Sequence, residues 1–194
     1  LVGSSGSAIG RTAGASQDAG EPDHAGLRGG RSIWYPWTAP TSGDVVFDTY
    51  GSTFNREFGG NRQTFETVAA LYAVDAERSD LVAANDNATP GLVSRVTSPA
   101  TAGETYHVAV DGKGGLIGCA QLNWRPRLGL SAIPFGRGWV GFRLQCQTGD
   151  GVVIEASADL VDWIPWGTIL ADGESFKWSD PPEAGRRFYR ARRE

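Results

Sequence analysis

Hydrophobic and polar residues alternate along much of the chain, in short runs that end at glycine, proline, asparagine or aspartate. A period of two residues is typical of half-buried β-strands, and helical periodicity is weak throughout. The pattern therefore predicts an all-β protein with the strand spacing of a β-sandwich. The predicted strands span residues 31–40, 43–51, 67–74, 79–85, 92–98, 104–112, 117–124, 139–148, 151–160, 163–170, 174–180 and 186–193.

The sequence also predicts the conformation of two connecting segments. The residues "PTSG" at 40–43 favour a tight turn, because proline and glycine supply the backbone angles that turns need. They predict a hairpin between the strands at 31–40 and 43–51. The polar, glycine-bearing segment 55–66 is predicted to be an exposed insertion.

A change of pattern after Trp124 predicts a domain boundary. Residues 125–138 contain two prolines and three glycines and show no clear alternation. We expect a β-sandwich over 1–124, a linker over 125–138 and a small antiparallel β domain over 139–194. A core of about 55 residues is marginal, so the second domain is expected to pack on the first domain or on a neighbouring chain.

Charge and composition narrow the class of protein. The 194 residues carry a net charge of −4, which argues against nucleic acid as a partner. No apolar run approaches the roughly 20 residues that span a bilayer, so no transmembrane segment is expected. The arginines of residues 186–193 are expected on a solvated terminal strand. Cys119 and Cys146 are candidates for a disulfide if the protein is exported, and otherwise are buried thiols.

The sequence gives no positive reason to expect catalysis. His24 and His107 are the only histidines, and His107 lies inside a strongly patterned strand, which favours a structural role. A nucleophile elbow, a zinc-binding HExxH helix, a phosphate-binding loop and a dinucleotide-binding glycine pattern are all missing from the sequence. We therefore expect that the protein is not an enzyme.

Calcium is the stronger chemical candidate, because it binds clustered carboxylate, amide and carbonyl oxygens in loops. One candidate ligand pair is Glu21 and Asp23 in "GEPDHAG" (20–26), and the other is Asn85 and Asp86 in "NDN" (85–87). The alternative is that both stretches are turns whose side chains bond to the backbone. In the first stretch, the flanking glycines are expected to bracket a turn in which Asp23 and His24 bond to backbone groups.

Seven tryptophans are many for this length, and exposed aromatic rings can grip sugars or partner surfaces. Trp163 and Trp166 in "WIPW" are the candidate exposed pair, and a period of two prevents them from sharing one face of a strand. Core packing is the alternative for every tryptophan.

Several stretches together resemble a known family. From "GEPDHAG" through "RSIWYPWTAPTSGDVVFDTYGSTF", "LVAANDN", "SRVTSPATAGETYHVAVDG" and "QLNW", residues 3–124 resemble the bacterial pre-peptidase C-terminal (PPC) domain family. The resemblance implies a non-catalytic, jelly-roll-like β-sandwich of secreted proteins, related in fold to collagen-binding domains, some of which bind calcium. The family's acidic, Asn-containing start is missing here, and residues 55–66 are additional.

The second part is similar to a short C-terminal β module of secreted bacterial surface proteins. The residues that carry this similarity are "GVVIEASADLVDWIPWGTIL", "ESFKWSD" and "RRFYRARR". Both resemblances imply an extracellular or cell-surface protein that mediates attachment or subunit assembly, and a chain that begins inside its first domain would polymerise by strand addition. The alternative is a module that binds polysaccharide or fibrous protein, with or without calcium.

Overall fold

The computed structural model describes residues 1–27, 29–54, 65–74, 79–88, 92–134, 140–147, 149–171, 175–180 and 187–194. These residues form β-strands joined by turns and loops, with one short 3-10 turn, η2 (Lys113–Gly115), and they confirm the predicted all-β class. The described part of the chain contains no helix with the length and hydropathy needed to cross a membrane. By its internal contacts the chain divides into two compact units, Leu1–Arg125 and Pro126–Glu194.

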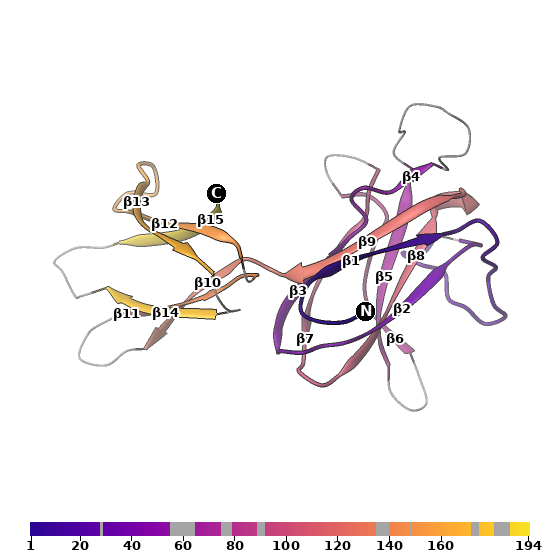
Figure 1. Cartoon of the computed structure of the whole chain (residues 1–194), viewed down its shortest axis with the longest axis horizontal. Helices are drawn as coiled ribbons and strands as arrows, with labels where there is room; N and C mark the ends of the chain where they lie inside the picture. Colours follow the sequence, from indigo (N-terminus) through magenta and orange to yellow (C-terminus); the bar gives the residue numbers. More distant parts are fainter. Residues whose placement is uncertain are drawn as a thin grey trace. The chain divides into compact units, whose positions relative to one another are not determined.

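Unit 1 is a β-sandwich of two antiparallel sheets (Figure 1). The five-stranded sheet has the order β1 (Gly6–Arg11), β9 (Gly118–Pro126), β3 (Gly43–Asp48) and β7 (Arg95–Ala100), and β4 (Thr53–Phe54) also pairs with β9. The four-stranded sheet has the order β2 (Ile33–Thr38), β8 (Thr105–Gly112), β5 (Thr67–Val74) and β6 (Ser79–Asn85).

The two sheets of unit 1 bury a common core because alternate side chains of each strand point inward. Phe47 of β3, Leu71 of β5 and Leu122 of β9 are all 0% exposed. The rings of Trp37 and Phe47, which come from opposite sheets, pack edge to face with their centroids 5.3 Å apart. This layer of apolar contacts holds the sheets face to face.

Strand β5 is buried on both of its faces, and this positions the site described below. Ala69 and Leu71 belong to the core between the sheets. Ala70 and Tyr72 point the other way and form a second buried cluster, against which Trp34 of β2 packs. A chain segment must therefore cover the outer face of the four-stranded sheet.

The predicted hairpin between residues 31–40 and 43–51 is wrong. Strands β2 and β3 both form, but β2 pairs with β8 and β3 pairs with β7, so they lie in different sheets. The connection between them turns a corner of the sandwich instead of closing a two-stranded ribbon. As a result, Trp37 of β2 and Phe47 of β3 contact each other across the core from opposite sheets.

Unit 2 has two three-stranded antiparallel sheets (Figure 1). One sheet has the order β10 (Gly129–Pro134), β11 (Val140–Gln145) and β14 (Ser175–Asp180), and the other has the order β13 (Ile164–Leu170), β12 (Gly151–Ser157) and β15 (Phe188–Arg193). Leu144 of β11 packs in one cluster with Val152 and Ile154 of β12, so the two sheets share a small core. A β-sandwich followed by a smaller β domain is therefore confirmed.

Two expectations about loops need correction. The segment expected as a linker, 125–138, contains β10, which pairs with β11 and therefore belongs to unit 2. Most of the expected insertion at 55–66 lies outside the described residues, but Phe65 at its end is 0% exposed and packs in the core of unit 1. Each segment carries apolar residues that pack in a core, which the glycines of both segments and the prolines of 125–138 concealed.

Candidate functional site

The stretch "GEPDHAG" forms a tight turn over the outer face of the four-stranded sheet. Leu27 N donates to His24 O at 2.9 Å, and the two residues between them, Ala25 and Gly26, have positive φ values of 54° and 70°. Positive φ at both central positions is the geometry of a type I′ turn, which glycine adopts without strain. The turn directs His24 inward, where it is 2% exposed.

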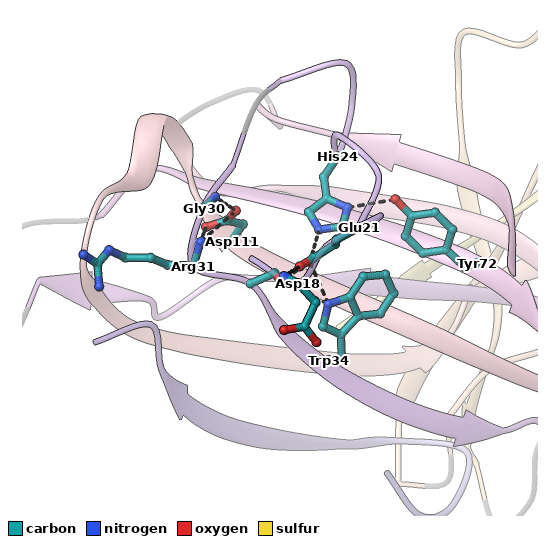
Figure 2. A network of polar contacts seen from close by, with 9 residues as sticks. Asp18, Glu21, His24, Gly30, Arg31, Trp34, Tyr72 and Asp111 are labelled. Carbon is teal, nitrogen blue, oxygen red and sulfur yellow. Dashed lines mark hydrogen bonds and ion pairs between the residues drawn. The ribbon is translucent and has the colours of Figure 1, made fainter. Parts of the chain in front are cut away.

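Glu21 is the centre of a buried polar network (Figure 2). Its Oε1 accepts hydrogen bonds from Trp34 Nε1 at 2.8 Å, from His24 Nε2 at 3.3 Å and from Ser32 Oγ. Its Oε2 accepts from Asp18 N at 3.0 Å. The Glu21 side chain is 6% exposed. The carboxylate thus joins the β1–β2 connection to strand β2.

His24 links this network to strand β5. Its Nδ1 lies 2.8 Å from Tyr72 Oη, and Figure 2 shows the imidazole between that hydroxyl and Glu21. A carboxylate can only accept hydrogen bonds, so His24 Nε2 donates to Glu21. Nδ1 of the neutral imidazole then accepts a hydrogen bond from the Tyr72 hydroxyl group. The His24 and Trp34 rings also pack edge to face, with centroids 5.3 Å apart. Both ring nitrogens therefore have partners.

Burial and hydrogen bonding shift two pKa values in this network. Burial raises the pKa of Glu21, but the hydrogen bonds from Ser32, the Asp18 backbone, Trp34 and His24 outweigh it, so the pKa lies below its ordinary value. Burial, with a smaller contribution from the Glu21 charge, raises the pKa of Tyr72 to about 12. At neutral pH the network therefore holds a charged carboxylate and a protonated phenol.

Ser32 and His24 do not form a nucleophile–base pair in this network. A serine nucleophile needs its hydroxyl on the imidazole base, whereas Ser32 Oγ bonds to Glu21 and His24 bonds to Glu21 and Tyr72. The expectation that His24 bonds to backbone groups through its side chain is wrong, because both ring nitrogens bond to side chains. Asp23 is exposed and lies outside the network.

Asn85 and Asp86, the second pair of candidate calcium ligands, are also engaged by protein donors. Asn85 Oδ1 accepts from Arg95 N at 3.2 Å. Asp86 Oδ2 lies 3.0 Å from Lys113 Nζ, which is also 2.6 Å from Glu66 Oε1. Hydrogen bonds to Glu66 and Asp86 raise the pKa of Lys113. Among the described residues, no group of three or more His, Cys, Asp or Glu side chains could hold a metal ion.

A second anchor of the β1–β2 connection was missed from the sequence. Asp111 of β8 is 1% exposed, and its carboxylate accepts from Gly30 N at 2.9 Å and from Arg31 N at 3.3 Å. A Cβ atom on Gly29 would lie 1.8 Å from Asp111 Oδ2, so this close approach requires glycine. The adjacent glycines at 29–30 were the available signal.

Both cysteines are free thiols in the structure. Cys119 lies on β9 of unit 1, and Cys146 belongs to the core of unit 2. Burial, with a smaller effect of the Asp150 charge, raises the pKa of the Cys146 thiol. A disulfide between them stays a prediction, and Cys146 has the surroundings of a buried apolar residue.

The candidate aromatic pair lies in unit 2. Arg190 Cζ lies 4.1 Å from the centroid of the Trp163 ring, and the Trp166 ring is 6.1 Å from that of Tyr189. Tyr189 and Arg190 are adjacent in β15, so their side chains point to opposite faces of the strand. Trp163 and Trp166 accordingly contact different faces.

Large hydrophobic side chains are exposed along one segment of unit 2. Within residues 160–170, which we call the apolar segment, the exposed fractions are 55% for Leu160, 77% for Val161, 70% for Ile164, 40% for Trp166 and 74% for Leu170. Sequence reasoning singled out only Trp163 and Trp166. The other exposed hydrophobic residues could not be predicted in this way, because β13 is an edge strand of its sheet only in the tertiary structure.

Comparison of the chain with protein-family models and with curated proteins found no match. The functional argument therefore rests on the geometry of these two regions.

Proposed function

We propose that this protein is a non-catalytic pair of β modules of the cell exterior, which mediates surface attachment or subunit assembly. The apolar segment is the observation that carries this proposal, because five large hydrophobic side chains are exposed within eleven residues. Scattered single hydrophobic residues are ordinary on protein surfaces, whereas several in one loop and the strand that follows it offer a partner repeated apolar contacts. The extracellular location rests on the resemblance to the PPC family and to surface-protein C-terminal modules.

The buried network of unit 1 supports a non-catalytic role. Glu21 and His24 are nearly inaccessible and are saturated by hydrogen bonds within the protein. A general acid or base needs to reach a substrate proton, and these groups hold a loop on a sheet instead. Unit 1 therefore serves as a stable scaffold in this proposal, and unit 2 carries the contact surface.

Site-specific photo-crosslinking in the producing cells tests the proposed function. A p-benzoylphenylalanine at Val161, which is 77% exposed, is expected to crosslink to a cell-surface component or to a second copy of the chain. The matched control is the same residue at Val82 of β6, which is 41% exposed on unit 1. Equal crosslinking from both positions, or none from Val161, contradicts the proposal.

Polysaccharide or fibrous-protein binding is the second candidate, and the exposure of Trp166 favours it. Trp166 is 40% exposed, whereas Arg190 covers one face of Trp163. Aromatic rings bind sugar rings by stacking, so co-sedimentation with cellulose and with collagen fibrils tests this function. Retention that is lost in Trp166→Ala supports it, and equal recovery of both proteins in the supernatant counts against it.

A further inference from the structure

Residues 16–27, which we call the flap, include the turn that lies over the outer face of the four-stranded sheet. His24 is the only buried residue of the flap, and the others are half-buried or exposed. The core between the two sheets contains no residue of the flap. Apolar burial therefore contributes little to holding the flap in place, and the sandwich does not depend on the flap for its core.

Both ends of the flap are fixed to unit 1. Thr12, before the flap, is 0% exposed, and its Oγ1 accepts from Gly118 N at 2.9 Å. After the flap, the backbone N–H groups of Gly30 and Arg31 donate to Asp111 of β8. The segment between these two anchors can therefore move without releasing either end.

Between the anchors, two side chains hold the flap on the sheet. Within the described part of the chain, the backbone hydrogen bonds of the flap are local turns, such as the one from Leu27 N to His24 O at 2.9 Å. The hydrogen bonds that leave the flap are those of Glu21 with Ser32 and Trp34, and that of His24 with Tyr72 (Figure 2). The position of the flap thus depends on the Glu21–His24 network.

Protonation of Glu21 weakens this network. The carboxylate accepts four hydrogen bonds, whereas a protonated carboxyl group carries a hydrogen that itself faces a donor. Burial raises the pKa of Glu21, but its hydrogen bonds outweigh burial and place the pKa below 4.5. The stabilisation is therefore complete above about pH 4.5 and is lost as the pH falls through the pKa of the folded state.

Other titratable groups around Glu21 do not replace its role. The titratable and charged side chains on the surrounding elements are Asp18, Asp23 and His24 of the flap, Arg31 after it, Tyr72 of β5, and His107 and Asp111 of β8. A protonated His24 still donates from Nε2 to Glu21, and the Tyr72 hydroxyl group can accept from its Nδ1. Protonation of His24 alone therefore keeps the flap in place.

We propose that the flap is an acid-released cover, which lifts from the outer face of the four-stranded sheet on protonation of Glu21 while the rest of unit 1 stays folded. Lifting uncovers Tyr72, which is 1% exposed, and one side of Trp34. The His24 ring now contacts both, with centroids 5.8 Å and 5.3 Å away. This inference concerns unit 1 and does not depend on the apolar segment.

Hydrogen exchange of the unaltered full chain, measured by NMR between pH 7 and pH 3, tests this inference. The reporters are the Trp34 indole N–H, which donates to Glu21, and the Leu27 amide, which belongs to a turn inside the flap. Protection of both, relative to unstructured peptide at the same pH, is expected to fall below about pH 4.5 by up to about tenfold per pH unit. The Trp37 indole N–H, which donates to Gly3 O at 3.0 Å, is expected to stay protected.

A variant and a matched control isolate the carboxylate. Glu21→Gln is expected to lower the protection of Trp34 and Leu27 at neutral pH by roughly 100-fold, and to remove its dependence on pH. Asp23→Asn makes the same acid-to-amide change at an exposed position of the flap and is expected to behave like the unaltered chain.

Three results overturn the inference. Simultaneous loss of protection at Trp34 and Trp37 means that acid unfolds the whole of unit 1. Protection that is independent of pH means that Glu21 does not hold the flap. Loss at Trp34 without loss at Leu27 means that one hydrogen bond breaks while the flap stays in place. Because the pH series uses the unaltered chain, it decides among these outcomes even if Glu21→Gln does not fold.

Discussion

Replacing Glu21 by glutamine tests whether the buried network holds the β1–β2 connection on unit 1. The carboxylate accepts four hydrogen bonds, three at Oε1 and one at Oε2. A glutamine that keeps its oxygen at the Oε1 position places an NH2 group against Asp18 N, where two donors face each other. The opposite orientation places that group against three donors. Neither orientation provides an acceptor for all four donors.

The magnitude follows from these contacts. A hydrogen bond to a charged group contributes about 1.5–3 kcal/mol, and one between neutral groups about 1 kcal/mol. Losing the charge and one partner while keeping the shape gives an expected loss of about 3 kcal/mol in the free energy of unfolding. For a domain of this size, 1 kcal/mol corresponds to roughly 4 °C, so the unfolding midpoint falls by about 12 °C.

The assay is thermal unfolding by calorimetry across a range of pH, with Asp18→Asn as the control. Asp18 is exposed and uses its backbone N–H in the network, so its acid-to-amide change leaves the contact intact. The pKa of Glu21 is lowered in the folded protein, so its contribution is full above the ordinary value of 4.5 and disappears as the pH falls through the folded pKa. The difference between the unaltered chain and Glu21→Gln should therefore shrink below about pH 4.5. A Glu21→Gln midpoint equal to that of Asp18→Asn, or a difference independent of pH, refutes the reasoning.

Three further outcomes are expected. Tyr72→Phe leaves the imidazole without one partner and lowers the free energy of unfolding in urea by about 1–2 kcal/mol, whereas Tyr50→Phe, at a site 71% exposed, changes little. Gly29→Ala forces the new methyl group against Asp111 and lowers the free energy of unfolding by about 1–3 kcal/mol, whereas Gly30→Ala has open space around its Cβ position and is tolerated. Hydrogen exchange of the neighbouring amides is expected to become faster in Gly29→Ala and to stay unchanged in Gly30→Ala. Millimolar calcium leaves the calorimetric midpoint unchanged, because the carboxylate at the centre of the network already accepts four protein donors; a rise of several degrees contradicts this.

Strand positions could be predicted from the sequence because alternation is a local property. The predicted ranges 67–74 and 79–85 coincide with β5 and β6. The burial of β5 needs no knowledge of distant residues, since its run of valine, alanine, leucine and tyrosine disfavours exposure in any β fold, whereas β6 is largely exposed. The same reasoning missed β10, whose glycine and proline indicated a linker.

Strand partners could not be predicted in the same way. The turn residues at 40–43 suit a hairpin and suit a corner between sheets equally well. Only the burial of Trp37 against Phe47 from opposite sheets distinguishes the two. The free energy of that contact depends on residues distant in the sequence, and a local pattern carries no information about it.

In the candidate site, too, some features could be predicted from the sequence and others depend on the tertiary structure. The sequence by itself determined an all-β chain in two parts, with an acidic, glycine-flanked turn that carries one of only two histidines. Tertiary structure alone decided that Glu21 accepts from Trp34 and His24, that His24 reaches Tyr72 at a distance of 48 residues along the chain, and that the apolar segment remains exposed. Composition and periodicity fix what a side chain can do, whereas its partners and its exposure follow from which strands the hydrophobic core brings together.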